Sequence, residues 1–257
     1  MNSVLEQMTP IGLDDMKAVR LMNRVDQKYM ASFCQLEELL GRVAGQYYVQ
    51  HIADEPLAPY RTLYFDTADL AMYTMHHNKK LNRQKLRVRT YRSTDTTFFE
   101  IKNKDNKKKT RKVRIPIDVS LFDNCLKVPD VAHFVDEHTS YPVMSLHECL
   151  ENKFERITLV DKGMKERVTI DSGISFHNRA TGIDADISHL LVIEVKHEVG
   201  APMSDIEKAL HEMHILPRRM SKYCIGTALT DPAAKYNRFK HKLLYINKIK
   251  EYGTRGI

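Results

Sequence analysis

Basic residues at every second position form the pattern in this sequence that is best suited to chemistry. Lys85, Arg87 and Arg89 alternate with Leu86 and Val88, and alternate positions of a β-strand lie on the same face of a sheet. Two arginines about 6.6 Å apart on one face repel each other by roughly 2 kcal/mol at an effective dielectric constant near 20. A strand with these residues therefore needs either water or an anion against its basic face.

The next two runs of the chain repeat this alternation. Glu100 and Lys102 are the polar positions of the first run, and Lys112 and Arg114 are those of the second. Short turn-forming segments separate the runs, so the whole segment is expected to form a meander of antiparallel strands. For one strand, a solvated sheet face explains the pattern equally well. Three consecutive strands with the same bias favour a surface that binds a polyanion.

Other parts of the chain must supply the elements that complete this sheet. Hydrophobic periodicity and capping residues indicate where these elements lie. Further strands are expected over residues 24–30, 47–52, 60–65, 151–160, 165–171 and 190–196, and helices over residues 12–20, 35–43, 121–138, 205–214, 220–229 and 235–250, with a short helix after Asp66.

Polar residues return at alternate positions in the later strands. Arg156 and Arg167 continue the cationic pattern some 50 residues after the meander. In the most apolar strand, Glu194 and Lys196 share one face. A carboxylate in such a strand is costly unless it meets a cation or a metal, so Glu194 is interpreted either as a metal ligand or as the partner of a neighbouring arginine.

Ser221 and Lys222 lie at the start of the helix expected over residues 220–229. The first N–H groups of a helix have no partner within it, and beside a serine and a lysine they can bind a phosphate. The motifs GxxxxGK[ST], GxGxxG and GxSxG are absent from the sequence. Phosphate binding would therefore not use a glycine-rich loop, and nucleophilic serine chemistry has no support.

Composition points to one domain with anionic partners. The 257 residues include 40 Lys and Arg against 33 Asp and Glu, which favours phosphates, nucleic acid or an anionic membrane surface. The four cysteines form no CxxC pair, so neither a zinc site nor a disulfide framework is indicated. With no signal peptide and no apolar run long enough to span a bilayer, we expect a soluble cytoplasmic protein.

We expect a single domain over residues 1–257, with a core at about 13–229. Residues 235–252 form its C-terminal basic amphipathic helix, which could bind a membrane, nucleic acid or its own sheet; packing on the sheet is the preferred interpretation. Nucleic-acid binding is disfavoured because aromatic residues do not interleave with the basic ones along one strand face.

Several short motifs, in their order, resemble one known family. They read K-Y near the start, Y-F-D-T, R-x-R, E-x-K, K-x-R, F-E-R, R-x-T-x-D, E-V-K and S-K-Y. Together they resemble the catalytic, polyphosphate polymerase domain of the vacuolar transporter chaperone (VTC) family, in the triphosphate tunnel metalloenzyme superfamily. The resemblance covers residues 13–229 and implies an α+β fold, in which an antiparallel closed β-barrel of about eight strands forms a basic tunnel with helices packed outside.

The resemblance also implies an activity and a site. Domains of this family transfer the γ-phosphoryl group of a nucleoside triphosphate such as ATP to polyphosphate, with Mn²⁺ or Mg²⁺. The site residues expected on this basis and from the alternation are Arg87, Arg89, Lys102, Arg156, Arg167 and Lys222 as catalytic, Lys28, Lys85, Lys112, Arg114, Lys196 and Ser221 as substrate-binding, and Glu194 and Glu100 as metal ligands. Partner proteins are not indicated by the sequence.

Two departures from related sequences bear on the function. Relatives that hydrolyse triphosphates carry E-x-E-x-K in the first strand, whereas here the segment from Arg24 to Lys28 keeps one carboxylate, Asp26. Phe154 stands where the polymerase pattern has tyrosine, which removes one hydroxyl contact to phosphate. A triphosphatase and a polyphosphate-binding module without turnover remain as alternatives to the polymerase.

Overall fold

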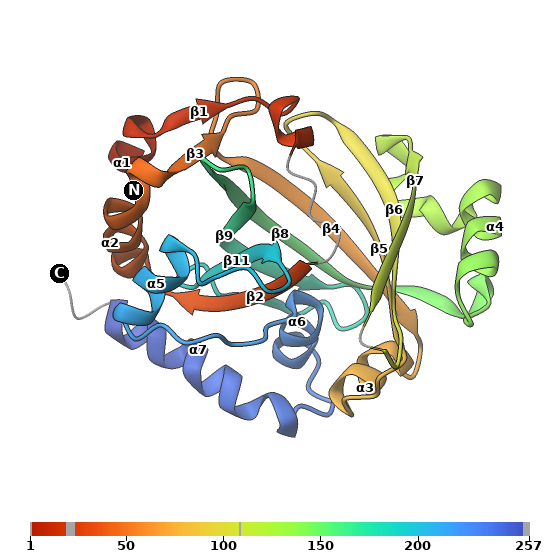
Figure 1. The fold of residues 1–257 in the computed structure, drawn as a ribbon. Coiled ribbons are helices and arrows are strands. Elements are labelled where there is room, and N and C mark those ends of the chain that lie inside the picture. Colours follow the sequence, from red (N-terminus) through yellow and green to blue (C-terminus); the bar gives the residue numbers. More distant parts are fainter. Residues whose placement is uncertain (1, 19–23, 108, 254–257) are drawn as a thin grey trace.

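One curved antiparallel sheet organises the chain (Figure 1). The computed structural model describes residues 2–18, 24–107 and 109–253. The main path of the sheet runs in the order β2 (Arg24–Ala31), β11 (Leu191–Glu198), β9 (Glu166–Asn178), β8 (Leu146–Asp161), β4 (Ala58–Thr67), β5 (Arg83–Tyr91), β6 (Thr96–Lys104) and β7 (Thr110–Ile117). The short strands β1 (Thr9–Ile11), β3 (Tyr47–Gln50) and β10 (Asp184–Asp186) extend it.

The sheet is a half-barrel, so the expected closed barrel is wrong. In the described part of the chain, β2 and β7 are the two ends of the strand order and do not pair with each other. The free edge of β2 is in contact with another segment of the chain instead of β7: the backbone carbonyl of Lys28 accepts a hydrogen bond of 2.6 Å from the backbone N–H of Arg218. Both edge strands also point basic side chains inward, Lys28 from β2 and Lys112 from β7, so closure would bring like charges together.

The outer face of the sheet is apolar and covered by helices, as the alternation predicted. Leu86, Val88, Phe99 and Ile101 are fully buried in a cluster with residues of η3 (Val119–Lys127) and α4 (Pro129–His138). On the other half of the sheet, α1 (Asn2–Gln7), α2 (Phe33–Val43) and α5 (Asp205–Glu212) cover β2, β11, β9 and β8. The helix expected over 121–138 is thus two elements, separated where Pro129 begins α4.

Helices also fill part of the inner face. Met30 and Val192 lie on the strand faces that carry the basic residues, and they belong to one apolar cluster with Tyr223 of α6 (Lys222–Thr230) and Ile246 of α7 (Lys240–Gly253). This cluster also contains Tyr73 of α3 (Ala71–His77). The C-terminal helix therefore packs on the domain, as preferred, and α6 occupies one end of the inner face.

The remaining elements are short. They are η1 (Asp15–Ala18), η2 (Ala44–Gln46), η4 (Val143–Ser145) and η5 (Asn237–Phe239). Of the helix expected over residues 12–20, the structure shows η1, and residues 19–20 lie outside the described chain. Among the described residues, no helix has the length and apolarity needed to cross a membrane.

Candidate functional site

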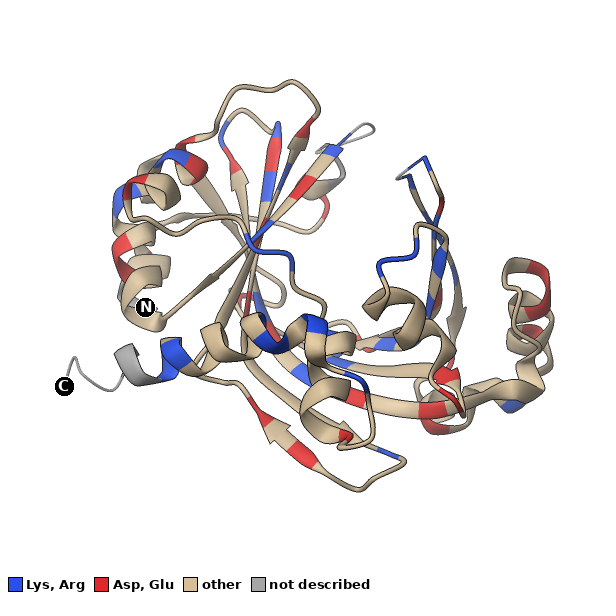
Figure 2. Ribbon diagram, turned by 90° about the horizontal axis from the view of Figure 1, so that it is seen from below, with Lys and Arg blue, Asp and Glu red and all other residues tan. Residues whose placement is uncertain are grey.

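A cavity of about 620 Å³ lies on the inner face of the half-barrel. Figure 2 shows Lys and Arg segments, in blue, on several strands of the half-barrel, and those whose side chains face inward line the cavity. Among the described residues, its lining contains eleven Lys and Arg against three carboxylates, which are Asp26, Asp171 and Glu194. The cavity is therefore strongly positive before any ligand binds.

Strand register explains why these residues converge. In β5, Lys85 is paired with Lys102 of β6 and Arg87 with Glu100, so their side chains share the inner face. On the opposite wall, Glu194 of β11 is paired with both Lys28 of β2 and Thr169 of β9. Because the side-chain period of a strand is two residues, basic residues at even spacings from these positions, such as Arg89 and Lys196, point to the same face of the sheet and line the same cavity.

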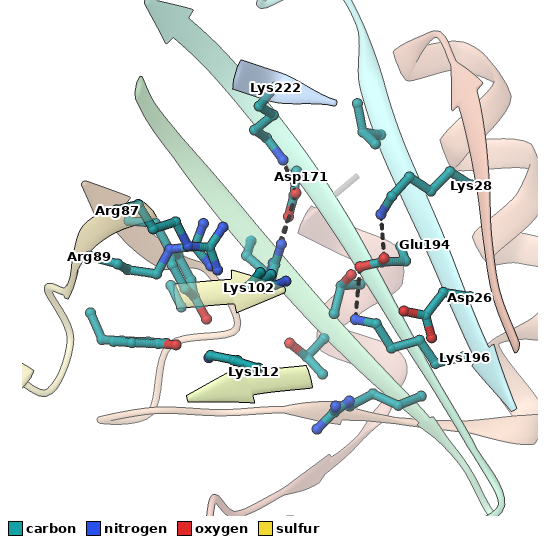
Figure 3. A pocket seen from close by; sticks show the side chains of 18 of the residues that line it. Asp26, Lys28, Arg87, Arg89, Lys102, Lys112, Asp171, Glu194, Lys196 and Lys222 are labelled. Atoms are coloured by element: carbon teal, nitrogen blue, oxygen red, sulfur yellow. Dashed lines mark hydrogen bonds and ion pairs between the residues drawn. The ribbon is translucent and has the colours of Figure 1, made fainter. Parts of the chain in front are cut away.

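Glu194 is shared by two lysines from the β2–β11 wall. Lys28 Nζ donates to one carboxylate oxygen, and Lys196 Nζ lies 2.8 Å from the other (Figure 3). Burial would raise the pKa of Glu194, but Lys196 and Lys28 outweigh it and hold this pKa well below its ordinary value. Of the two alternatives for Glu194, an ion pair is observed, but its partners are two lysines rather than a neighbouring arginine.

Glu100 occupies an equivalent position in the β5–β7 wall. Its carboxylate accepts a hydrogen bond of 2.7 Å from Arg87 Nε and forms an ion pair with Lys112. The side chain is fully buried, and it does not line the cavity. Both contacts of Glu100 are therefore with cations of the same wall, and its expected role as a metal ligand stays a prediction.

Asp171 is the third shared carboxylate. Arg156 donates to it through Nε at 2.6 Å and through a terminal nitrogen at 2.9 Å, and Lys222 Nζ donates to it as well. These two cations outweigh the effect of burial and lower the pKa of Asp171, and burial lowers the pKa of Lys222 to about 8. Asp171 thus ties α6 to the sheet.

Other cations in the lining have no carboxylate contact among the described residues. Lys85 Nζ donates to Ser221 Oγ at 2.8 Å, and Arg89 Nε donates to Thr62 Oγ1 at 3.0 Å. The side chains of Lys102 and Arg167 make no hydrogen bond or ion pair within the described chain, and Arg167 Nε is buried without a partner. The hydroxyl of Thr169, beside Arg167 on β9, is buried without a partner too.

Lys102 shows how strongly the site lacks negative charge. Repulsion from Arg87 is the main cause that lowers the pKa of Lys102 to about 6, and burial adds to it. Burial likewise lowers the pKa of Lys196 to about 8, despite its contact with Glu194. A bound polyanion would supply the missing charge and raise both pKa values.

Two stacked rings lie beneath the basic groups at the centre. The rings of Tyr60 and Phe154 are 5.0 Å apart and inclined by 13°. Arg89, Arg156 and Lys222 lie over the Phe154 ring at 5.6, 5.3 and 4.2 Å. A ring face attracts a cation, so the aromatic pair holds three cations without adding a negative charge.

Twelve of the fourteen expected site residues, all of them described, line the cavity. The exceptions are Glu100 and Arg114; the guanidinium of Arg114 lies 4.1 Å from the centre of the Phe98 ring. Asp171 and His76 also line the cavity, although neither was among the expected site residues. Asp171 was present in the R-x-T-x-D motif, whereas nothing in the sequence places His76 there.

A divalent metal fits this site only together with phosphate. No group of three or more His, Cys, Asp and Glu residues within the described chain could hold a metal ion. Glu194 and Asp26 both line the cavity (Figure 3), but Glu194 is held by two lysines and Asp26 by Arg24. Mg²⁺ commonly uses one or two carboxylates and completes its shell with substrate phosphates and water, and these residues suit that arrangement.

Comparisons with known proteins agree with the motifs. The family model of the VTC domain matches residues 23–230. No curated protein matches the sequence. Similar solved structures include a candidate adenylyl cyclase from Hippeastrum, described as having a dominant triphosphatase activity; it is 14% identical with a TM-score of 0.49, and the match covers 81% of this chain and 97% of that one.

Two further structures are similar. One is a candidate adenylate cyclase from Vibrio parahaemolyticus, which is 10% identical with a TM-score of 0.46 over 80% of this chain and 99% of that one. The other is a protein from Pyrococcus horikoshii OT3, which is 15% identical with a TM-score of 0.44 over 80% of this chain and 98% of that one.

Proposed function

The chain belongs to the VTC domain family, and from this premise we propose that it is a polyphosphate polymerase that transfers the γ-phosphoryl group of ATP to a polyphosphate chain. The observation that carries the proposal is the charge of the cavity, eleven Lys and Arg residues against three carboxylates among the described lining residues. A linear polyphosphate carries about one negative charge per phosphate and could compensate this excess along the whole cavity.

The unpartnered donors indicate where phosphates would bind. Lys102 and Arg167 come from opposite walls of the cavity, and neither meets a carboxylate among the described residues. Lys85 donates to the hydroxyl of Ser221. Arg89 donates to the hydroxyl of Thr62 and lies over the Phe154 ring, so neither cation has a carboxylate contact in the described chain. Guanidinium groups bind phosphate oxygens in pairs, and lysines act as point charges. These four residues would contact phosphate first, without breaking an internal ion pair.

The paired cations would contribute at the reacting phosphate. Phosphoryl transfer depends mainly on positioning and on neutralising charge at the phosphate oxygens. Arg87, Arg156 and Lys222 are fixed by buried carboxylates, so they are oriented before the substrate arrives. Preorganised cations need little rearrangement as charge develops in the transition state.

Mn²⁺ or Mg²⁺ is proposed as the cofactor. Glu194, with Asp26 on the adjacent strand, would hold the ion on the β2–β11 wall. When bound, such an ion neutralises phosphoryl oxygens as a Lewis acid. Lys28 and Lys196 would then turn from Glu194 towards phosphate, since both line the same cavity.

The test is the product formed from ATP. Purified protein is incubated with ATP and MnCl₂, and ADP, free phosphate and polymer are separated by gel electrophoresis and ³¹P NMR. We expect one ADP for each phosphate unit that is added to the polymer. Arg167→Ala should reduce polymer formation at least tenfold, since a charge-assisted hydrogen bond contributes about 1.5–3 kcal/mol. Arg42→Ala removes an arginine from exposed ion pairs on α2 and serves as the matched control.

A triphosphatase is the second candidate, and the open sheet favours it. Because β2 and β7 do not pair in the described chain, water could reach a bound phosphate from the side of the half-barrel. Release of free phosphate from ATP or tripolyphosphate, without polymer, would identify this activity. Tight binding of polyphosphate with no turnover under any metal would identify a binding module instead.

A further inference from the structure

The Y-F-D-T motif has no role in the chemistry above, yet its aspartate is one of the most constrained groups in the molecule. Asp66 is fully buried. One carboxylate oxygen accepts hydrogen bonds of 2.8 Å from the backbone N–H groups of Thr67 and Met72, and the other accepts one of 2.8 Å from the N–H of Tyr73. Asp66 therefore caps α3, whose N-cap residue, Leu70, provides no side-chain hydrogen bond.

A further donor comes from a distant part of the chain. The hydroxyl of Tyr223 donates to the same carboxylate oxygen as the Tyr73 N–H. Tyr223 is 2% exposed, and burial together with the Asp66 charge raises its pKa well above 10. The phenol therefore stays protonated and remains a donor at any pH at which the protein is studied.

Tyr223 follows the two residues through which α6 reaches the cavity. Ser221 caps α6 and accepts the hydrogen bond from Lys85 of β5, while Lys222 binds Asp171 of β9. The start of α6 thus bridges the two walls of the half-barrel. In a sheet that does not close, such a bridge sets how far apart the walls stand.

We propose that the Asp66–Tyr223 hydrogen bond is a positioning device, which fixes the start of α6 so that Ser221 and Lys222 bridge the β5 and β9 walls at the spacing the anion requires. Neither Asp66 nor Tyr223 lines the cavity, so both act through α6. The inference rests on the proposed binding of phosphate chains in this cavity, but not on turnover.

The test compares two buried tyrosines of the same cluster. Tyr223→Phe removes the hydroxyl that binds Asp66. Tyr73→Phe is the matched control, because the Tyr73 hydroxyl is also buried but donates to the backbone carbonyl of Lys235, at 2.9 Å. Binding of inorganic tripolyphosphate is measured by calorimetry without metal, and Lys222 is titrated by NMR of its labelled side chain.

We expect Tyr223→Phe to weaken tripolyphosphate binding about tenfold, which corresponds to about 1.4 kcal/mol, and to move the pKa of Lys222 from about 8 towards its ordinary value as the side chain leaves its buried position. Tyr73→Phe should lower thermal stability and leave both readouts unchanged. The proposal fails if Tyr223→Phe behaves like Tyr73→Phe in both readouts. If the unsubstituted protein does not bind tripolyphosphate, the proposed function fails, while the Lys222 titration still tests the device.

Discussion

Lys102 allows the sharpest test of the idea that the empty cavity is short of negative charge. It makes no ion pair among the described residues, and it lies diagonally across from Arg87 on the adjacent strand. Diagonal neighbours are about 7 Å apart, and two unit charges at this distance repel by about 2.4 kcal/mol at an effective dielectric constant of 20. Lys102→Met removes this repulsion and keeps a similar side-chain length.

The substitution should therefore make the free protein more stable and weaken its binding of tripolyphosphate. We expect the free energy of unfolding to rise by about 2 kcal/mol, which for a chain of this size raises Tm by about 5 °C. Loss of a charge-assisted contact to phosphate should weaken tripolyphosphate binding tenfold or more, since such contacts contribute about 1.5–3 kcal/mol. Differential scanning calorimetry and isothermal titration calorimetry measure the two effects separately.

Lys196→Met is the matched control, and we expect it to lower the stability of the free protein, whereas Lys102→Met should raise it. Lys196 is 9% exposed and forms an ion pair with Glu194. Its removal leaves Glu194 with Lys28 alone, and breaking a buried pair destabilises a protein by about 3–5 kcal/mol in well-buried cases. Both variants lose one lysine from the cavity, so tripolyphosphate binding should weaken in both.

The effect of Lys102→Met should also depend on pH. The pKa of Lys102 is about 6 in the folded protein and about 10.4 in an unfolded chain. Lys102 therefore lowers the free energy of unfolding by its full amount below pH 6. The penalty decreases as pH rises and disappears above about pH 10.4. The gain in stability should be largest near pH 6 and shrink by pH 9. If Lys102→Met lowers the free energy of unfolding, or raises it equally at every pH, then Lys102 is neutralised by a nearby anionic group and the repulsion from Arg87 does not dominate.

Three further outcomes are expected. Glu194→Gln should abolish metal-dependent turnover but retain or strengthen tripolyphosphate binding in EDTA, because it releases two lysines from their carboxylate; calorimetry and the ATP assay together measure this. Phe154→Leu should weaken tripolyphosphate binding several-fold, since each cation–π contact contributes about 0.5–2 kcal/mol. Phe154→Tyr keeps the ring under its three cations and restores the hydroxyl of the polymerase pattern, so it should bind at least as tightly as the unsubstituted protein. At pH 7, the protein should take up protons when it binds tripolyphosphate, because the anion raises the lowered pKa of Lys102. Calorimetric titrations in buffers of different ionisation enthalpy measure this proton uptake, which should be smaller for Lys102→Met.

Period-two alternation was enough to predict which strand faces line the cavity. Lys85, Arg87 and Arg89 line the cavity, and Leu86 and Val88 are fully buried on the other face. A shift of one residue in register would exchange these two sets, so the pattern specifies the face strongly. The same reasoning placed Glu194 and Lys196 in the cavity from the opposite wall.

What the alternation could not predict is how the ends of the sheet meet. Closure depends on whether β2 and β7 find each other, and this depends on contacts that no local pattern encodes. The bond from Arg218 to Lys28 occupies the β2 edge, and its partners are 190 residues apart. The alternation also did not predict that Glu100 is fully buried outside the cavity lining, between Arg87 and Lys112 of the two neighbouring strands.

His76 shows a third limit. It stands at the end of α3, and no pattern in the sequence indicates that its side chain reaches the cavity. The packing of α3 against α6 and η5 instead turns His76 into the lining of the cavity, and burial lowers its pKa to about 2. A histidine held neutral in this way adds no charge to the site.

The three shared carboxylates explain how so basic a cavity can exist without its ligand. Each of Glu100, Asp171 and Glu194 binds two cations, so six of the basic residues are oriented by charge that belongs to the protein. If carboxylates of the protein neutralised all of the cations, no positive charge would remain for a polyanion to bind. If they neutralised no cation, the repulsion between the cations would exceed the usual free energy of unfolding, about 5–15 kcal/mol. The observed arrangement lies between these limits. Cations such as Lys102 and Arg167, which lack a carboxylate in the described chain, provide the attraction, and the paired cations provide the geometry.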